Sequence, residues 1–189
     1  MPLDRPPLVY VMGPSGAGKD SVLGYSRANL APADRVVFAH RYITRPAEAG
    51  GENHIALTHT EFEARKAAGL FAFDWQAHET CYGIGTEVQT WQRAGMTVVM
   101  NGSRTHFSGL KSAASIVPVI ITAPADILTQ RLAGRGRENE EQILARVQRE
   151  AVPTNDASTI VIDNSGPLDV AGRQFLDLVR RLAPTPVDA

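Results

Sequence analysis

The sequence predicts an α/β fold in which a parallel sheet is covered by helices on both faces, giving three layers. Short apolar runs alternate with segments of helical spacing along most of the chain. These runs are apolar throughout instead of alternating with polar residues, which is typical of strands buried on both faces. The first run ends in a glycine-rich loop that leads directly into a helical segment.

The expected strands are the segments in which apolar residues, many of them β-branched, stand together. They cover residues 8–12, 36–39, 70–73, 97–100, 117–122 and 159–162. Helices are expected where apolar residues recur at helical spacing, and Gly69 and Gly95 end two of them. These helices cover residues 19–30, 60–68, 87–93, 125–132, 140–149 and 168–182.

The chain is predicted to form one domain, because its 189 residues suit a single hydrophobic core. The segment 41–86 is rich in Gly, His and aromatic residues, and its strands are short. We expect it to form a small acceptor-binding lobe over the edge where the strands end, since such folds bind ligands there. The core then comprises 8–40 and 95–183, with a lid at about 132–140 and a flexible tail at 184–189.

Composition excludes several classes of protein. Apolar residues make up 43% of the chain and charged residues 21%, with a net charge of −1, so neither a nucleic-acid polymer nor a membrane is expected as a partner. The start of the chain does not resemble a signal peptide, and no apolar run is long enough to span a bilayer. The single cysteine, Cys81, allows no internal disulfide, which fits a cytoplasmic location. A homodimer of the chain stays open as an alternative to a monomer.

The glycine-rich loop lies between a strand and a helix, where a phosphate-binding loop needs to lie. Glycines let backbone N–H groups converge on an anion, and the following helix adds the positive end of its dipole. Lys19 can reach the β- and γ-phosphates of ATP and neutralise charge during phosphoryl transfer. We therefore predict ATP as co-substrate, bound by the loop Gly13-Pro14-Ser15-Gly16-Ala17-Gly18-Lys19. The strand and helix on either side disfavour the alternative, a glycine-rich turn that arose by chance.

Asp20 stands where this loop pattern usually has Ser or Thr, and Ser21 follows it. The usual hydroxyl helps to hold Mg²⁺, and a carboxylate oxygen is a stronger ligand for that ion. Asp20 is therefore predicted as a Mg²⁺ ligand, directly or through water, with Ser21 as a weaker candidate. The alternative is that Asp20 is a helix-start residue favoured by the helix dipole.

Arginines separated by glycines join two of the expected helices. Arg131, Arg135 and Arg137 are predicted to close over the transferring phosphoryl group, because guanidinium groups match phosphate oxygens in pairs. Arg131 and Arg135 are also predicted to contact ATP, and Arg146 on the next helix belongs to the same catalytic set. The alternative is an exposed connection in which these arginines pair with the acidic residues within 138–141.

A second group of cationic residues is predicted to bind the acceptor. Arg41 and Arg45 belong to the lobe, and Arg104 follows a strand at the edge where ligand contacts are expected. Together they can hold an acceptor with more than one phosphate, whereas the alternative for each is a surface ion pair. Further substrate contacts are predicted for neighbouring polar residues, namely Thr44, His54, Asn101 and Ser103.

No general base stands out in the sequence. Asp74 and His78 are candidates for moving a proton, and a structural role is the alternative for both. If the attacking atom is a phosphate oxygen, no base is required, because that oxygen is already anionic.

These motifs together resemble the guanylate kinase family. The matching blocks are the phosphate loop, Thr44-Arg45-Pro46, Asp74-Trp75 with Tyr82-Gly83, Arg131-Leu132 with Arg135-Gly136, and Ile162-Asp163-Asn164. The resemblance implies the P-loop α/β/α fold of that family. It also implies substrate contacts for Asp74 and Tyr82, and a position near the adenine for Asn164.

The residues that read guanine in that family are replaced here. Glu48 stands in place of a second arginine, His54 in place of a tyrosine and Arg41 in place of a serine. Asn101 and Ser103 replace an acidic pair. A site that reads a base through buried polar groups rejects ligands that leave such groups unpaired, so GMP is a poor candidate for the acceptor.

The residues that differ from the guanylate kinase pattern resemble those of the ribose 1,5-bisphosphate phosphokinase family. This resemblance extends over about residues 8–182. The shared blocks are Lys19-Asp20-Ser21 and the segments 40–45, 52–57, 101–104 and 135–138. The resemblance implies transfer of the ATP γ-phosphoryl group to the 1-phosphate of ribose 1,5-bisphosphate, giving 5-phosphoribosyl 1-diphosphate in phosphonate catabolism. The ribose hydroxyls would need hydrogen-bond partners, which Asn53, His54 and Asn101 can supply.

Two other functions stay open as alternatives. One is a guanylate or other nucleoside monophosphate kinase of relaxed specificity, which would share every donor-side residue. The other is a non-catalytic binding module of the same fold. Such modules usually lose the phosphate loop or the lid arginines, whereas Lys19, Arg135 and Arg137 are all present.

Overall fold

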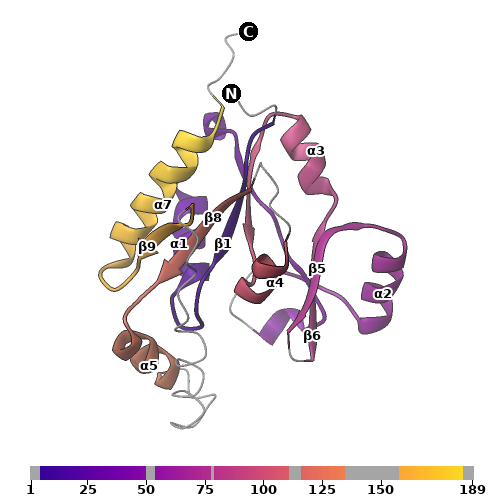
Figure 1. The fold of residues 1–189 in the computed structure, drawn as a ribbon, viewed down its shortest axis with the longest axis horizontal. Helices are drawn as coiled ribbons and strands as arrows, with labels where there is room; N and C mark the ends of the chain where they lie inside the picture. The colour runs from indigo at the N-terminus through magenta and orange to yellow at the C-terminus, as the bar shows by residue number, and fades with distance from the viewer. Residues whose placement is uncertain (1–4, 50–53, 78, 111–115, 135–157, 185–189) are drawn as a thin grey trace.

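The computed structural model describes residues 5–49, 54–77, 79–110, 116–134 and 158–184, and Figure 1 shows their arrangement. The strands are β1 (Leu8–Met12), β2 (Val36–Phe38), β3 (Tyr42–Ile43), β4 (Ile55–Ala56), β5 (Phe71–Ala77), β6 (Thr80–Gly85), β7 (Thr97–Asn101), β8 (Ile116–Thr122) and β9 (Ile160–Asp163). The helices are α1 (Lys19–Ala28), α2 (His59–Ala67), α3 (Glu87–Arg93), α4 (Arg104–Gly109), α5 (Ala125–Ala133) and α7 (Leu168–Leu182), with short 3-10 turns at Pro32–Asp34 and Ala47–Ala49. None of the helices within these ranges is both long and apolar enough to cross a membrane. The helix predicted at 140–149 lies outside the described residues.

Five strands form one parallel sheet in the order β2-β7-β1-β8-β9. β1 is central, since Val9 pairs with Val99 of β7 on one side and with Val117 of β8 on the other. The pairs β2–β7 and β8–β9 are parallel as well. The predicted parallel sheet is therefore confirmed, and all five strands end at the same edge, where ligands of such sheets bind.

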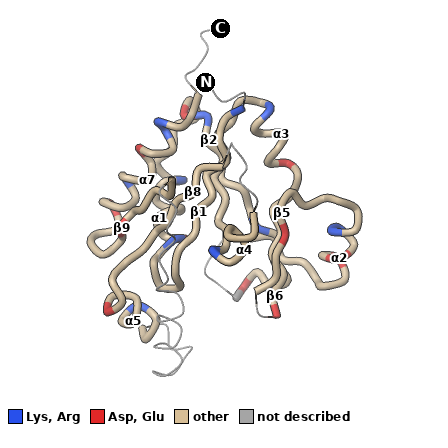
Figure 2. The backbone as a smooth tube through the Cα atoms, in the orientation of Figure 1, with Lys and Arg blue, Asp and Glu red and all other residues tan. Residues whose placement is uncertain are grey.

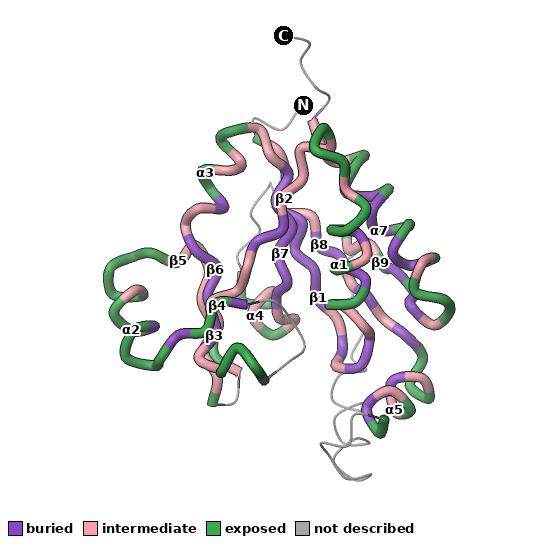
Figure 3. Tube along the Cα trace, turned by 180° about the vertical axis from the view of Figure 1, so that it is seen from behind, coloured by how far each residue is buried: buried purple, intermediate pink, exposed green. Residues whose placement is uncertain are grey.

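Alternate residues of β1 belong to two separate cores, one on each face of the sheet. Val9 and Val11 pack with residues of α1, α5 and α7, whereas Tyr10 and Met12 pack with residues of α3, α4, β5 and β6. Every residue of β1 is buried, which explains why this strand is not patterned in alternation. Figure 3 shows the buried residues concentrated along the central strands. The fold thus has the predicted three layers.

α1 and α7 cover the same face of the sheet and touch closely. A Cβ atom at Gly172 of α7 would lie 2.3 Å from Cδ1 of Tyr25 in α1, so this approach requires glycine. The Ser26 hydroxyl donates a buried hydrogen bond of 3.1 Å to the Gly172 carbonyl. This contact fixes α1, and with it the loop that precedes α1, against the C-terminal helix.

A second sheet, with strand order β4-β3-β6-β5, lies to the right of the first in Figure 1. Its pairs β5–β6 and β3–β6 are antiparallel, and β3–β4 is parallel. α2 packs on it through Phe62, whose ring stacks on Phe71 with 4.7 Å between the centroids. These elements lie between β2 and β7 in the chain, where an inserted lobe was predicted. We refer to residues 41–86 as the lobe.

Four elements beside the site were not predicted, namely β3, β4, β6 and α4. β6 contains Gly83 and Gly85, which by themselves favour a turn or a bulge. Gly83 is needed here because a Cβ atom would lie 2.7 Å from the Phe71 ring. α4 has six residues, and Ser103 at its N-cap makes no side-chain capping bond, so little local signal marks this helix. β5 also extends further than expected, to Ala77.

Candidate functional site

The glycine-rich loop connects β1 to α1 at the end of the central strand. A Cβ atom at Gly13 would lie 2.0 Å from the carbonyl oxygen of Ile121 in β8, so glycine is required there. Gly18 is the N-cap of α1 with a φ of 78°, a left-handed conformation that favours glycine. Because no side chain caps α1, the loop and the helix start present backbone N–H groups in the arrangement that binds phosphate.

The ammonium group of Lys19 lies against this loop. Its Nζ donates to the carbonyl oxygen of Gly13 over 2.9 Å and to that of Pro14 over 3.3 Å. These acceptors are neutral, whereas a phosphate oxygen is charged and would form a hydrogen bond about twice as strong. The loop thus holds the lysine where a nucleotide phosphate would engage it.

Asn164, which follows β9, supports the same loop. The residue is 3% exposed, and its side chain donates from Nδ2 to the carbonyl oxygen of Ala17 over 2.7 Å. Its backbone N–H donates to Thr122 at the end of β8, also over 2.7 Å. Its Oδ1 is buried and has no hydrogen-bond partner among the described residues. The structure therefore places Asn164 on the phosphate loop, and a contact with the adenine stays a prediction.

Arg131, in the last turn of α5, reaches this loop as well. Its Nη1 lies 3.9 Å from the position that a Cβ atom would take at Gly18. This Nη1 is buried and makes no hydrogen bond with any residue that the structure describes. A buried donor without an acceptor is costly, and a phosphate in the loop would supply the acceptor. The other three predicted lid and catalytic arginines, Arg135, Arg137 and Arg146, lie outside the described residues.

Asp20 and Asn101 connect the loop to the end of β7. Asn101 donates from Nδ2 to Oδ1 of Asp20 over 2.9 Å. Asp20 is exposed and lies on α1 beside Ser21, whereas Asn101 is 8% exposed. The buried Oδ1 of Asn101 has no hydrogen-bond partner within the described part of the chain. The predicted substrate contact Asn101 is thus also the residue that orients the predicted metal ligand.

Arg41, just before β3, brings a positive charge from the lobe towards Asp20. Its guanidinium carbon lies 5.1 Å from the centre of the Tyr82 ring, a cation–π distance. Burial lowers the pKa of Arg41, Asp20 and Tyr82 raise this pKa, and Arg45 lowers it further. Arg41 and Arg45 are therefore close enough to repel each other, and an anion bound between them would relieve that repulsion.

Two predicted substrate contacts support the backbone around Arg45. Nε2 of the buried His54 donates to the carbonyl oxygen of Arg45 over 3.1 Å. Oγ1 of Thr44 accepts from the N–H of Cys81 over 2.8 Å and so joins β3 to β6. Both side chains act on the position of Arg45, a role that the sequence did not indicate.

The remaining predicted residues have varied surroundings. The carboxylate of Asp74 forms an ion pair of 2.5 Å with Lys66 of α2. Ser103 is held by its backbone, which contacts the hydroxyl of Tyr10 at 3.1 Å. Asn53 and His78 lie outside the described residues.

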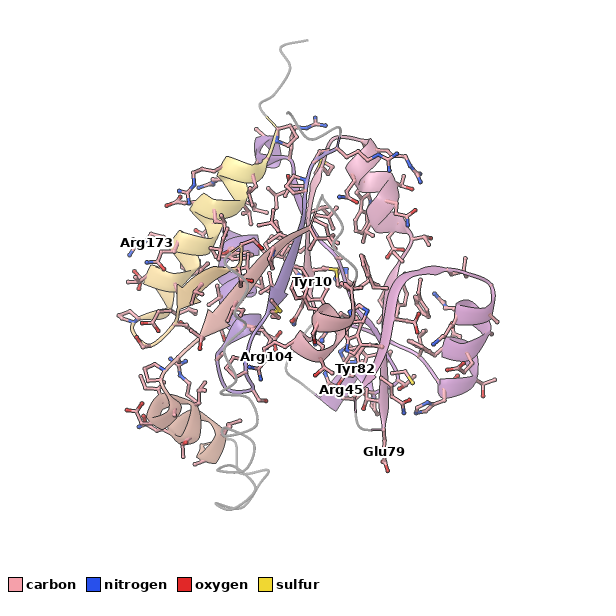
Figure 4. All side chains as sticks on the ribbon, viewed as in Figure 1. Tyr10, Arg45, Glu79, Tyr82, Arg104 and Arg173 are labelled. Atoms are coloured by element: carbon pink, nitrogen blue, oxygen red, sulfur yellow. The ribbon has the colours of Figure 1, made fainter. Side chains whose placement is uncertain are left out.

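Positive charge surrounds the phosphate loop on more than one side. Figure 2 marks Lys and Arg residues on α1, on α5 and beside α4, at the lower end of the main sheet. In Figure 4, Arg45 and Tyr82 of the lobe and Arg104 of α4 lie in this lower part, whereas Arg173 lies on the outer side of α7. This arrangement is suited to bringing together two phosphorylated molecules.

Relatives of known name match nearly the whole chain, although no family model matches it. The chain is 48% identical over 174 residues to a protein of Desulfomicrobium baculatum named ribose 1,5-bisphosphate phosphokinase PhnN, covering 91% of this chain and 93% of that protein. A protein of the same name from Burkholderia mallei is 49% identical over 180 residues, covering 93% of this chain and 96% of that protein. The chain belongs to the ribose 1,5-bisphosphate phosphokinase PhnN family. The resemblance found from the sequence is thereby confirmed.

The fold of this PhnN-family chain is shared with guanylate kinase. A crystal structure of guanylate kinase from Anaplasma phagocytophilum superposes with a TM-score of 0.63 at 15% identity, covering 92% of this chain and 84% of that one. Identity this low shows the fold alone. The predicted guanylate kinase-like P-loop fold is therefore confirmed.

Sequence reasoning missed two residues of this PhnN-family protein that lie beside the site, Tyr10 and His106. The Tyr10 hydroxyl lies 2.8 Å from Nδ1 of His106 and also contacts the backbone of Ser103. One signal was available, because Tyr10 carries the only hydroxyl in the apolar segment 8–12, and a buried hydroxyl usually finds a partner. His106 gave no signal, since the short helix α4 was not predicted.

Proposed function

We propose that this chain transfers the γ-phosphoryl group of ATP to the 1-phosphate of ribose 1,5-bisphosphate, forming 5-phosphoribosyl 1-diphosphate. Membership of the PhnN family supports this proposal, because relatives at 48% and 49% identity carry that activity in their names. The structural observation that carries it is the pair Arg41 and Arg45, two half-buried residues whose positive charges repel each other, with the carboxylate of Asp20 attracting Arg41. An acceptor with two phosphates suits such a pair better than a neutral acceptor does.

The reaction needs charge neutralisation more than proton transfer. An oxygen of the acceptor 1-phosphate forms a bond to the γ-phosphorus of ATP, the bond from that phosphorus to the β–γ bridging oxygen breaks, and ADP leaves. The attacking oxygen is already anionic, so no general base is needed. Lys19 and Arg131 are the described donor-side cations for the charge that spreads over the transferring group. Arg135, Arg137 and Arg146 stay predictions for the same task.

The donor side also fits Mg²⁺. Mg²⁺ in kinases is usually held by one or two carboxylates together with substrate phosphates and water. No cluster of three or more His, Cys, Asp or Glu side chains suited to a metal occurs in the described ranges. Asp20 would hold the ion, because Asn101 engages only one of its two carboxylate oxygens, and Ser21 is the second candidate. When bound, Mg²⁺ would neutralise charge on the β- and γ-phosphates.

The acceptor side combines charge with hydrogen bonds. We assign the two acceptor phosphates to Arg41, Arg45 and Arg104, and a ribose hydroxyl to Asn101, whose buried Oδ1 lacks a partner among the described residues. A hydroxyl donating to this oxygen would satisfy it. His54 acts behind Arg45 in this proposal, since its Nε2 already donates to the Arg45 carbonyl.

The test is an assay of ADP release with ribose 1,5-bisphosphate, GMP and AMP as competing acceptors. We expect turnover with ribose 1,5-bisphosphate well above that with either nucleotide, and phosphorus NMR should show a new diphosphate at C1 of the ribose. Faster turnover of GMP would instead establish a nucleoside monophosphate kinase. A protein that does not bind ATP at all would revive the non-catalytic module.

The cellular setting follows from the same proposal. ATP and ribose 1,5-bisphosphate are the expected partners, and a cytoplasmic location fits them and the single cysteine, Cys81. The homodimer stays a prediction, which light scattering of the purified chain would test.

A further inference from the structure

A column of planar side chains joins the lobe to the main sheet. The rings of Tyr82 and Trp75 stack with 5.5 Å between centroids and 6° between planes. Trp75 stacks on His106 of α4 at 4.9 Å and 20°, and His106 stacks on Tyr10 of β1 at 6.1 Å and 28°. The fifth planar group is the guanidinium of Arg41, which lies over Tyr82 at 5.1 Å. We refer to these five residues as the column.

Hydrogen bonds fix the inner end of the column. The hydroxyl of Tyr10 lies 3.1 Å from both the N–H and the carbonyl oxygen of Ser103, and 2.8 Å from Nδ1 of His106. A phenol has one hydrogen to donate and two positions that accept. All three contacts are satisfied only if Tyr10 donates to the Ser103 carbonyl and accepts from the Ser103 N–H and from His106 Nδ1–H. The ring of His106 is therefore oriented by a hydrogen bond from the central strand as well as by stacking.

This hydrogen-bond pattern is stable near neutral pH. Burial raises the pKa of Tyr10 to about 12, so its hydroxyl keeps its hydrogen. Burial also lowers the pKa of His106, with the Asp74 carboxylate opposing that shift, so the ring is neutral. The column therefore keeps one arrangement under the conditions in which the enzyme would work.

The outer end of the column carries a charge that the reaction needs. Arg41 interacts electrostatically with Asp20 on α1 and with Arg45 of the lobe, so its charge acts on the helix that follows the donor loop and on the acceptor side. A guanidinium group binds phosphate through the edge of its plane, so the direction of that plane decides whether both N–H bonds can form. The contact with the face of the Tyr82 ring, 5.1 Å from the guanidinium carbon, restricts the orientation of that plane.

We propose that Tyr10 and His106 are positioning residues for the acceptor: through Trp75 and Tyr82 they set the plane of the Arg41 guanidinium. The inference rests on the proposed function, in which Arg41 binds an acceptor phosphate. Neither residue touches the reacting atoms. The donor loop is held by other contacts, such as the hydrogen bond from Asn164 to Ala17. Disruption of the column therefore weakens use of the acceptor selectively and leaves use of ATP unchanged.

The experiment compares three variants of the full chain. His106→Ala removes a ring from the middle of the column, whereas His106→Phe keeps a ring and loses only the hydrogen bond. Phe107→Ala is the matched control, because Phe107 belongs to the same helix and packs on Tyr10 at 5.1 Å but lies outside the column. KM for ribose 1,5-bisphosphate, KM for ATP, kcat and Tm are measured for each.

We expect His106→Ala to raise the KM for ribose 1,5-bisphosphate by about tenfold with the KM for ATP unchanged, as for a misplaced binding group. His106→Phe should recover most of this loss, and Phe107→Ala should lower Tm without changing either KM. If His106→Ala does not fold, Tyr10→Phe tests the inference instead. We expect Tyr10→Phe to raise the KM for ribose 1,5-bisphosphate by about threefold, a smaller change because every ring of the column is kept.

Two results would overturn the inference while leaving the proposed function intact. The first is that His106→Ala has the wild-type KM for the acceptor. If His106→Ala does not fold, the same result in Tyr10→Phe counts instead. The other is an equal rise of acceptor KM in Phe107→Ala. A wild-type chain that does not turn over ribose 1,5-bisphosphate would refute the proposed function itself, and the inference with it.

Discussion

Replacing Asn164 by Asp tests whether this side chain holds the phosphate loop. The substitution keeps the size of the side chain and removes the amide N–H that donates to the Ala17 carbonyl, with 2.7 Å between Nδ2 and that oxygen. An ionised carboxylate would face that carbonyl oxygen at a position only 3% exposed. Two hydrogen-bond acceptors, the carboxylate and the carbonyl oxygen, would then face each other at a buried position, where an unpaired charge is most costly.

The magnitude follows from comparison with Asn164→Ala. Alanine loses one buried hydrogen bond but also removes the Oδ1 that has no hydrogen-bond partner among the described residues, so the two effects partly cancel and about 1 kcal/mol of stability is lost. The carboxylate has no such compensation and should cost about 3 kcal/mol. For a chain of this size, Tm should fall by roughly 2–4 °C in Asn164→Ala and roughly 6–12 °C in Asn164→Asp.

The pH dependence gives a second readout. When protonated, the new carboxyl group can donate its own hydrogen to the Ala17 carbonyl, so folding raises its pKa above the unfolded value of about 3.9. A carboxyl whose folded pKa is raised favours the folded state below the unfolded pKa, and this advantage is lost as the pH rises through the folded pKa. The Tm of Asn164→Asp should therefore approach the wild-type Tm at about pH 4 and separate from it towards about pH 8. Equal Tm values for Asn164→Asp and wild type at the higher pH would refute the reasoning.

Three further predictions concern charged side chains. Lys19→Ala should lower kcat for phosphoryl transfer by about 100-fold or more, since it removes a cation from the transferring group; full activity in the ADP-release assay would contradict the role of the loop. Arg45→Ala should weaken kcat/KM for the acceptor by about 2 kcal/mol or more, whereas Arg173→Ala, on the outer side of α7 (Figure 4), should leave it unchanged. The hydrogen bond from Arg180 lowers the pKa of Asp34, so this pair stabilises the fold above the unfolded pKa of about 3.9 and loses that contribution as the pH falls. Arg180→Ala should therefore lose less stability than wild type when the pH is lowered from about 5 to about 3 in thermal unfolding.

The main sheet was predictable because its strands are apolar and its central strands, β1 and β7, are buried on both faces. In the segment 8–12, alternate residues pack into the cores on the two faces of the sheet, so every position is apolar and buried. Such a continuous apolar run predicts a buried strand directly. The helices α3 and α7 have the predicted bounds, Glu87–Arg93 and Leu168–Leu182, because their apolar spacing and end signals agree. In the lobe, by contrast, β3 and β4 have two residues each. Such strands exist through pairing with distant segments, which no local pattern records.

The site was predictable where a local motif carries the chemistry, as at the phosphate loop and Lys19. Its supporting contacts were not, because they join residues far apart in the chain. Asn101 bonds Asp20 from 81 positions away, and Asn164 bonds Ala17 from 147 positions away. Partners at such separations are set by the topology of the sheet, and a single sequence records no trace of them.

The place of the lobe in the chain has a consequence for how this enzyme class diversifies. The lobe lies within the connection from β2 to β7, two adjacent parallel strands in which Phe38 pairs with Val99. Both ends of that connection are thus anchored in the main sheet, and what lies between them can be lengthened, shortened or exchanged without shifting the register of any core strand. One part of the acceptor site can therefore be grafted between relatives as a single continuous stretch, whereas Asn101, Arg104, Tyr10 and His106 are inherited with the main sheet and the ATP-binding loop.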